Sequence, residues 1–129
     1  MKKDLEVKPY KKYVSKCWDL LNEGMNQKHS IYQFRRVYVR ENKSGVCPTL
    51  TANMGMGGHN VPLIRDDNNK IRKLTPRECL LLQGFPSTFS IPKDIVDSRI
   101  YKQAGNSVSV NVIKRIAEQI LKALKENEK

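Results

Sequence analysis

The chain has 129 residues, with 24 Lys and Arg against 13 Asp and Glu, a net charge of +11 and a hydrophobic fraction of 39%. This composition supports one folded domain, or part of a larger one, and argues against wholesale disorder. The longest apolar run, Cys79 to Leu82, is far too short to cross a bilayer, and no apolar run follows Lys2 and Lys3 as in a secretory signal. We therefore expect a cytoplasmic protein with no membrane segment.

The cysteines and the charge distribution further narrow the kinds of site and partner that the protein can have. Three widely spaced cysteines without nearby histidine pairs predict reduced thiols and no metal site. Residues 1–74 carry a net charge of +8 and residues 75–129 a net charge of +3. A basic N-terminal portion favours a polyanionic partner, most simply nucleic acid, although solvated lysines that only keep the protein soluble would give the same balance.

The N-terminal portion is predicted to hold one helix followed by strands. Residues 10–23 place apolar side chains at helical spacing, and Gly24 suits the helix end. Residues 31–40 are rich in β-branched and aromatic types and predict a single strand. Alternation puts two sets of side chains on opposite faces of it. One face carries Tyr32, Phe34, Arg36, Tyr38 and Arg40, and the other carries Ile31, Gln33, Arg35, Val37 and Val39.

The middle of the chain is predicted to be short strands and loops. In order, we expect a turn at 41–45, an extended piece at 46–51, an open loop at 52–60 with glycines at 55, 57 and 58, and strands at 61–65 and 70–74 joined by a turn.

The C-terminal portion predicts two helices. Thr75 and Glu78 form a capping box around Pro76, so a helix should run to about residue 83 and end at Gly84. Residues 85–99 are predicted to be irregular. A turn at 105–107, with Ser107 as cap, should start a long helix that reaches about residue 125. Its apolar face comprises Val112, Ile113, Ile116, Ala117, Ile120, Leu121 and Leu124.

No group of residues forms a self-contained catalytic site, but the chain offers a binding surface. Cys47 is not paired with either histidine, and the glycine loop matches neither a phosphate-binding nor a dinucleotide-binding motif. Arginine on the predicted strand can contact phosphates or base edges, and glycines let a backbone approach them closely. The candidate residues are Arg35, Arg36, Tyr38 and Arg40. A solvated sheet face is the alternative for the same pattern.

Three blocks of the sequence, taken together, resemble motifs of a known protein family. They are Cys47-Pro48-Thr49-Leu50-Thr51-Ala52-Asn53 before the glycine loop, Arg72 to Cys79 continuing to Gln83-Gly84-Phe85-Pro86, and Tyr101-Lys102-Gln103-Ala104-Gly105-Asn106-Ser107-Val108. In this order and spacing they resemble the C-terminal part of bacterial DNA cytosine-5 methyltransferases. The first resembles the end of the target-recognition domain, and the others resemble the ninth and tenth motifs. The resemblance covers about residues 31–129 and, more loosely, residues 10–30.

The resemblance implies an α+β fragment of the α/β methyltransferase architecture. Residues 1–74 would be a partial target-recognition domain, small and β-rich. Residues 75–129 would be the ninth-motif helix and the long tenth-motif helix, which packs on a catalytic domain. The implied partners are double-stranded DNA and a catalytic methyltransferase subunit, and the implied cofactor is S-adenosylmethionine, shared with that catalytic half.

The resemblance also assigns residues. Arg36, Tyr38 and Arg40 match the basic recognition strand, with Arg36 the expected base contact. Thr49 matches a phosphate-binding position, and Gly55, Gly57 and Gly58 match the loop that lines the space left by the flipped cytosine. Asn106, Ser107 and Val108 match the segment that closes the cofactor pocket.

The family's cofactor loop and Pro-Cys nucleophile motif are absent from this sequence; Cys47 precedes Pro48, in the wrong block. No residue is therefore expected to be catalytic. The leading hypothesis is the DNA-recognition and pocket-completing part of a restriction-modification methyltransferase, which methylates C5 of cytosine only with a catalytic half. The alternatives are an inactive remnant, a stand-alone DNA-binding module, and an interaction domain with incidental charge.

Overall fold

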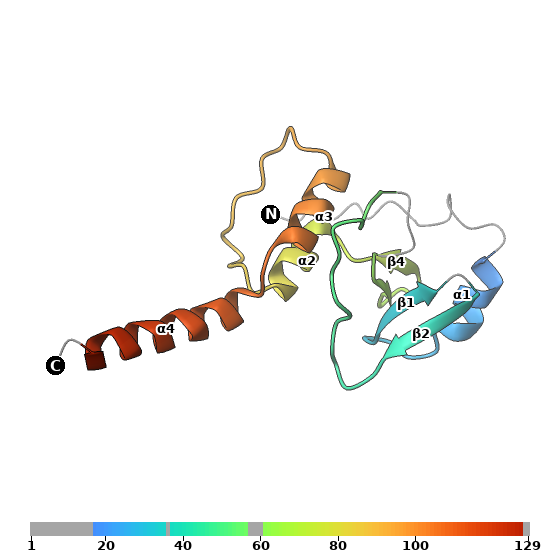
Figure 1. The fold of residues 1–129 in the computed structure, drawn as a ribbon. Coiled ribbons are helices and arrows are strands. Elements are labelled where there is room, and N and C mark those ends of the chain that lie inside the picture. The colour runs from blue at the N-terminus through green and yellow to red at the C-terminus, as the bar shows by residue number, and fades with distance from the viewer. Residues whose placement is uncertain (1–16, 36, 57–60, 128–129) are drawn as a thin grey trace.

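The computed structural model describes residues 17–35, 37–56 and 61–127 (Figure 1). Within these ranges the chain forms four helices and four strands. They are α1 (Trp18–Gly24), β1 (Ile31–Arg35), β2 (Tyr38–Asn42), β3 (Leu63–Arg65), β4 (Ile71–Lys73), α2 (Pro76–Leu82), α3 (Asp97–Asn106) and α4 (Val110–Asn127). The first half of the helix expected at 10–23 lies outside the described residues, and α1 accounts for the second half.

The strands form one antiparallel sheet in the order β2-β1-β3-β4. The single strand predicted for 31–40 is wrong, because the chain reverses after Arg35 and pairs with itself. Gln33 lies opposite Arg40, and Arg35 opposite Tyr38. Directly opposed residues share a sheet face, so Arg35 lies on the same face as Tyr38 and Arg40 rather than on the other.

Helix α1 covers one face of the sheet. A buried cluster there joins Leu21, Met25, Tyr32, Phe34, Leu63 and Ile71. The buried Arg65 anchors the same side, since its Nε donates to the Met25 carbonyl (2.8 Å) and its Nη2 to the Asn22 carbonyl (3.0 Å). Nη1 donates to the carbonyl and side chain of Asn69. The guanidinium therefore satisfies carbonyls that the end of α1 leaves unpaired and ties α1 to the β3–β4 turn.

A second core lies on the opposite side and joins the sheet to α2 and α3. It contains Leu50, Met54, Val61, Leu74, Cys79, Leu80, Ile100, Tyr101 and Ala104. These residues come from both sides of position 74. The division of roles between residues 1–74 and 75–129 stays a prediction.

Helix α2 forms as the sequence predicts, because its signals are local. The Thr75 hydroxyl accepts from the Glu78 amide (3.2 Å), and the Glu78 carboxylate accepts from the Thr75 amide (2.7 Å). Arg72 adds a two-pronged ion pair to Glu78 at 2.8 Å. Burial raises the pKa of Glu78, but the hydrogen bonds from Arg72 and Thr75 outweigh it and leave the pKa lowered. Gly84 ends the helix at φ +88°.

Helix α3 corrects the prediction of an irregular stretch and a turn at 105–107. Gly105 and Asn106 lie in its last turn, and Ser107 follows it. Ser107 therefore does not cap α4; its hydroxyl donates to the Ala104 carbonyl at 2.7 Å. The start of α3 at Asp97 carries no side-chain cap hydrogen bond, so its sequence lacks the signal that marks α2.

Gly105 is where α3 touches the rest of the chain most closely. A Cβ atom there would lie 2.1 Å from the Thr51 carbonyl oxygen and 2.6 Å from the Ala52 nitrogen. Both are backbone atoms and cannot rotate away. Glycine at this position therefore allows α3 to rest directly on the backbone of the first block.

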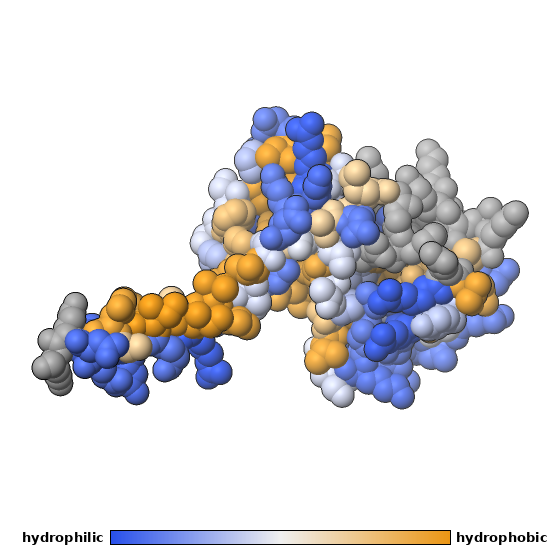
Figure 2. Space-filling model, viewed as in Figure 1, coloured by the Kyte–Doolittle hydropathy of each residue, from blue (hydrophilic) through white to orange (hydrophobic). Residues whose placement is uncertain are grey.

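Helix α4 projects from the rest of the molecule with one side apolar (Figures 1 and 2). None of its residues is buried. The apolar face expected from the sequence is open, with side chains 45–58% exposed at Val112, Ile113, Ile116, Ile120, Leu121 and Leu124. Within the described ranges, no helix has the length and apolar content that crossing a bilayer requires.

We predict that Gly105→Ala destabilises the fold. Helix propensity alone would favour alanine by about 1 kcal/mol. The clash with the Thr51–Ala52 backbone should reverse that sign and cost about 1–3 kcal/mol or more. Urea unfolding of the two proteins measures the difference. Lys102→Ala, an exposed position of α3, is the control and should change little; a stabilised Gly105→Ala protein would contradict the close approach.

Candidate functional site

The three blocks of the sequence pack against one another in the structure. Tyr101 of the third block donates its hydroxyl hydrogen to the Leu74 carbonyl of the second (2.5 Å). Gln83 donates to the Ala104 carbonyl (3.1 Å), and its own carbonyl accepts from the Val110 amide (2.8 Å). Gly105 completes the set by resting on Thr51 and Ala52. Residues far apart in the sequence thus form one compact unit.

Burial keeps the Tyr101 hydroxyl in its donating form. Desolvation, followed by the nearby acidic groups Cys79, Asp97 and Glu78, raises the pKa of Tyr101 well above its ordinary value. The hydrogen bond to Leu74 therefore persists across the physiological pH range. It fixes α3 to the end of β4, beside the start of α2.

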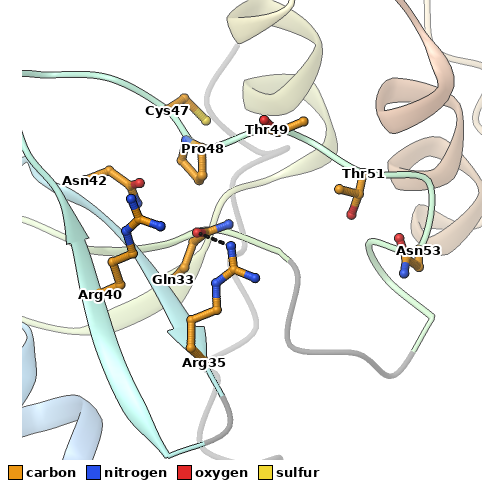
Figure 3. Close-up of a pocket in the computed structure, with 9 residues that line it drawn as sticks. All are labelled: Gln33, Arg35, Arg40, Asn42, Cys47, Pro48, Thr49, Thr51 and Asn53. Atoms are coloured by element: carbon orange, nitrogen blue, oxygen red, sulfur yellow. Dashed lines mark hydrogen bonds between the residues drawn. The ribbon is translucent and has the colours of Figure 1, made fainter.

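A polar pocket of about 370 Å³ lies between the β1–β2 hairpin and the segment 47–53 (Figure 3). The hairpin supplies Gln33, Arg35, Arg40 and Asn42, and the segment supplies Cys47, Pro48, Thr49, Thr51 and Asn53. None of these lining residues is acidic. Two guanidinium groups without a carboxylate give the pocket a positive potential, which suits a ligand rich in anionic or acceptor groups.

The structure brings together three of the predicted site residues. Arg35, Arg40 and Thr49 all line the polar pocket. Tyr38 lies opposite Arg35 at the hairpin end and is 56% exposed. Gly55 does not line this pocket. Its φ is +75°, and a Cβ atom added there would lie 2.9 Å from the Tyr101 ring. Arg36, Gly57 and Gly58 lie outside the described residues.

Four polar lining residues were missed by the sequence analysis. They are Gln33, Asn42, Thr51 and Asn53. Gln33 and Asn42 were missed because the hairpin was not recognised; a two-residue connection between strands of alternating character is the signal that could have revealed it. Thr51 and Asn53 belong to the first block, where only Thr49 was singled out.

Cys47 lines the pocket but is not an activated nucleophile. Burial raises its pKa to about 11, so the thiol is protonated near neutral pH. The neighbouring buried Cys79 is raised further, to about 12, by burial and by Cys47 and Glu78. Within the described ranges, no three His, Cys, Asp or Glu side chains come together as a metal site would require.

The three residues expected at the cofactor lie at the C-terminal end of α3, where Asn106 is its last residue, and on the connection to α4. Asn106 and Val108 are exposed, whereas Ser107 is half-buried and turned toward Ala104. An exposed amide and an exposed apolar side chain can form part of one wall of a binding site. They do not enclose one, and neither lines the polar pocket.

Comparison with known proteins identifies the relatives of this chain. The model of the family described as C-5 cytosine-specific DNA methylase matches residues 2–122. Type II methyltransferase M.Bsp6I of Bacillus sp. (strain RFL6) is 61% identical over 104 residues, which are 81% of this chain and 32% of that protein. Type II methyltransferase M.DsaV of Dactylococcopsis salina is 34% identical over 126 residues, 84% of this chain and 35% of that protein.

A third relative, type II methyltransferase M1.ScrFI of Lactococcus lactis subsp. cremoris, is 44% identical over 81 residues, 63% of this chain and 20% of that protein. No solved structure matches the chain significantly. The chain spans about a third or less of the length of these curated relatives.

We predict that alkylation of Cys47 is slow at neutral pH and accelerates with pH. With a pKa of about 11, its thiolate fraction should rise about tenfold per pH unit between pH 7 and 9. Peptide-resolved mass spectrometry after iodoacetamide treatment measures this, with the urea-unfolded chain as the reference. Cys79 in the same chain should react more slowly still. A rate that levels off below pH 8 would indicate an activated thiolate and contradict the assignment.

Proposed function

Because the chain belongs to the C-5 cytosine-specific DNA methylase family, we propose that it is the DNA-recognition part of a type II cytosine-5 methyltransferase. In this proposal it also completes the cofactor pocket, and methyl transfer occurs only together with a catalytic half. The observation that carries the proposal is the polar pocket. It presents Arg35 and Arg40 with no acidic residue in its lining, and it is built beside the three packed blocks.

The β1–β2 hairpin is the element that we propose enters DNA. The major groove admits a two-stranded β-ribbon. β2 is an edge strand, and the hairpin end is open, with Val37 77% and Tyr38 56% exposed. Arg35 and Arg40 would then face the duplex, and Thr49 on the opposite wall would contact a phosphate. Arg36 stays a predicted base contact, and Gly55, Gly57 and Gly58 stay the predicted lining of the space left by a flipped base.

S-adenosylmethionine would be held in part by Asn106, Ser107 and Val108, and when bound it supplies the methyl group. The position of these residues fits such a role because they lie at the C-terminal end of α3, and the same helix carries Tyr101 and its contact to the second block. This chain would contribute one wall, and a catalytic half would enclose the rest. No lining residue of the polar pocket takes part in that wall.

The apolar face of α4 is where we propose that the catalytic half docks. Its side chains are about half exposed, although such residues are ordinarily buried. Figure 1 shows α4 projecting on the side away from the hairpin, so a partner on α4 would leave the hairpin free for DNA.

We predict that methylation needs both parts. The assay is transfer of labelled methyl groups from S-adenosylmethionine to duplex DNA. It compares this chain, the portion of M.Bsp6I that the chain does not match, and the two co-expressed. Activity is expected only in the combination. Methylation by the purified chain alone would contradict the proposal. If the combination does not methylate DNA but the chain binds DNA in a salt-dependent way, a stand-alone binding module is favoured. If neither methylation nor DNA binding is observed, an inactive remnant is favoured.

We predict that Ile116→Lys separates assembly from folding. The side chain is 49% exposed in the chain alone, so the unfolding midpoint and DNA binding should be unchanged. In the combined assay, an ammonium group buried without a partner costs several kcal/mol, so methylation should fall about tenfold or more. Gln119→Lys adds the same charge on the polar side of α4 and should leave activity intact. Equal effects of the two variants would argue against docking on the apolar face.

A further inference from the structure

Gln33 is an unusual member of the polar pocket because it is itself buried. It lies in β1, opposite Arg40 in the β1–β2 register, and is only 7% exposed. Its Oε1 accepts a hydrogen bond from Nη2 of the exposed Arg35 at 3.0 Å (Figure 3). A buried amide thus fixes one nitrogen atom of an exposed guanidinium by a hydrogen bond.

The rest of that guanidinium is available to a ligand. A guanidinium carries five N–H donors in a planar fork. Within the described part of the chain, the Arg35 side chain makes no hydrogen bond besides the one to Gln33, and the Arg40 side chain makes none. The two arginines are diagonal neighbours across the strands, on one face of the sheet. Like charges so placed repel each other unless a ligand supplies acceptors.

A fixed fork favours a base edge over a phosphate. A phosphate can also pair with an arginine fork, but its oxygens accept hydrogen bonds from many directions, so one fixed orientation of the side chain is not required. The O6 and N7 atoms of guanine are two acceptors fixed in one plane, and they match a planar fork bidentately. Holding one Nη in place lowers the freedom that Arg35 must lose when it forms such a pair.

We propose that Gln33 is a positioning residue that orients Arg35 to recognise a guanine in the major groove of the target duplex. This inference rests on the proposed DNA-recognition function and names the base class that the pocket takes. Arg35 touches the base, and Gln33 acts through Arg35. Arg40, opposite Gln33, supplies a second donor group on the same face.

The test is base preference measured with the full chain. Each protein selects from a duplex library with randomised central positions, and bound and unbound DNA are sequenced. Gln33→Met keeps the side-chain length but removes the acceptor. It should reduce the preference for guanine at one position by about tenfold while total binding to random DNA changes much less. Arg35→Ala should abolish the same preference.

Two further variants separate positioning from packing and charge. Gln33→Glu keeps an acceptor for Arg35, so it should retain the guanine preference while binding all DNA more weakly. Arg99→Ala removes an exposed charge on α3 and should leave the preference intact. Unfolding midpoints are measured in parallel. If Gln33→Met does not fold, Gln33→Glu and Arg35→Ala still decide, because loss of preference in the glutamate variant overturns the positioning role.

The outcomes distinguish this inference from the proposed function. Salt-dependent binding with an unchanged preference in Gln33→Met overturns the positioning role and leaves DNA recognition standing. A uniform loss of affinity for all sequences in Arg35→Ala assigns Arg35 to phosphate and overturns guanine recognition. No salt-dependent binding by the unmodified chain overturns both.

Discussion

The missing side chain at Gly105 is the constraint on which the rest of this structure depends. It lets α3 lie directly on the backbone of Thr51 and Ala52. That contact places Tyr101 where its hydroxyl donates to the Leu74 carbonyl. It also places the Ala104 carbonyl where it accepts from the Gln83 side chain. The segment 47–53, which forms one wall of the polar pocket, is thereby fixed to the helices that lead to α4. The wall of the polar pocket and the helices that lead to α4 are thus joined by backbone-to-backbone contact.

The sequence predicted elements whose signals are local and missed those set by distant contacts. α2 was predicted well because Thr75, Pro76, Glu78 and Gly84 each act within one helix. α3 was missed because Gly105 is typical of a turn, whereas its reason here is a neighbour more than fifty positions away in the chain. The β1–β2 hairpin was missed because its connection lacks Asn or Gly. That error alone placed Arg35 on the wrong face of the sheet and left Gln33 and Asn42 out of the predicted site. Arg40 and Thr49 were predicted as site residues without knowledge of the strand pairing.

The two exposed features of the chain have opposite chemistry and lie apart. The polar pocket is lined by amides, hydroxyls and guanidinium groups, and its field reaches into solvent. The apolar face of α4 carries no such field and attracts only a surface that fits it. In the proposed function, encounter with DNA should therefore be fast and sensitive to salt, whereas assembly through α4 should be governed by shape and by buried area.

Because no residue of α4 is buried, the helix receives almost no stabilisation from the core. Its order in the absence of a partner is set by its own helix–coil equilibrium, and an 18-residue segment in water is close to the length at which helices become marginal. Glu118 and Lys122, four positions apart, add about 0.3–0.5 kcal/mol. Fraying of α4 would leave the sheet and pocket unaffected. In the proposed docking, ordering α4 is then part of the free energy of assembly. The association is weaker than its buried area alone would give, and it is readily reversible.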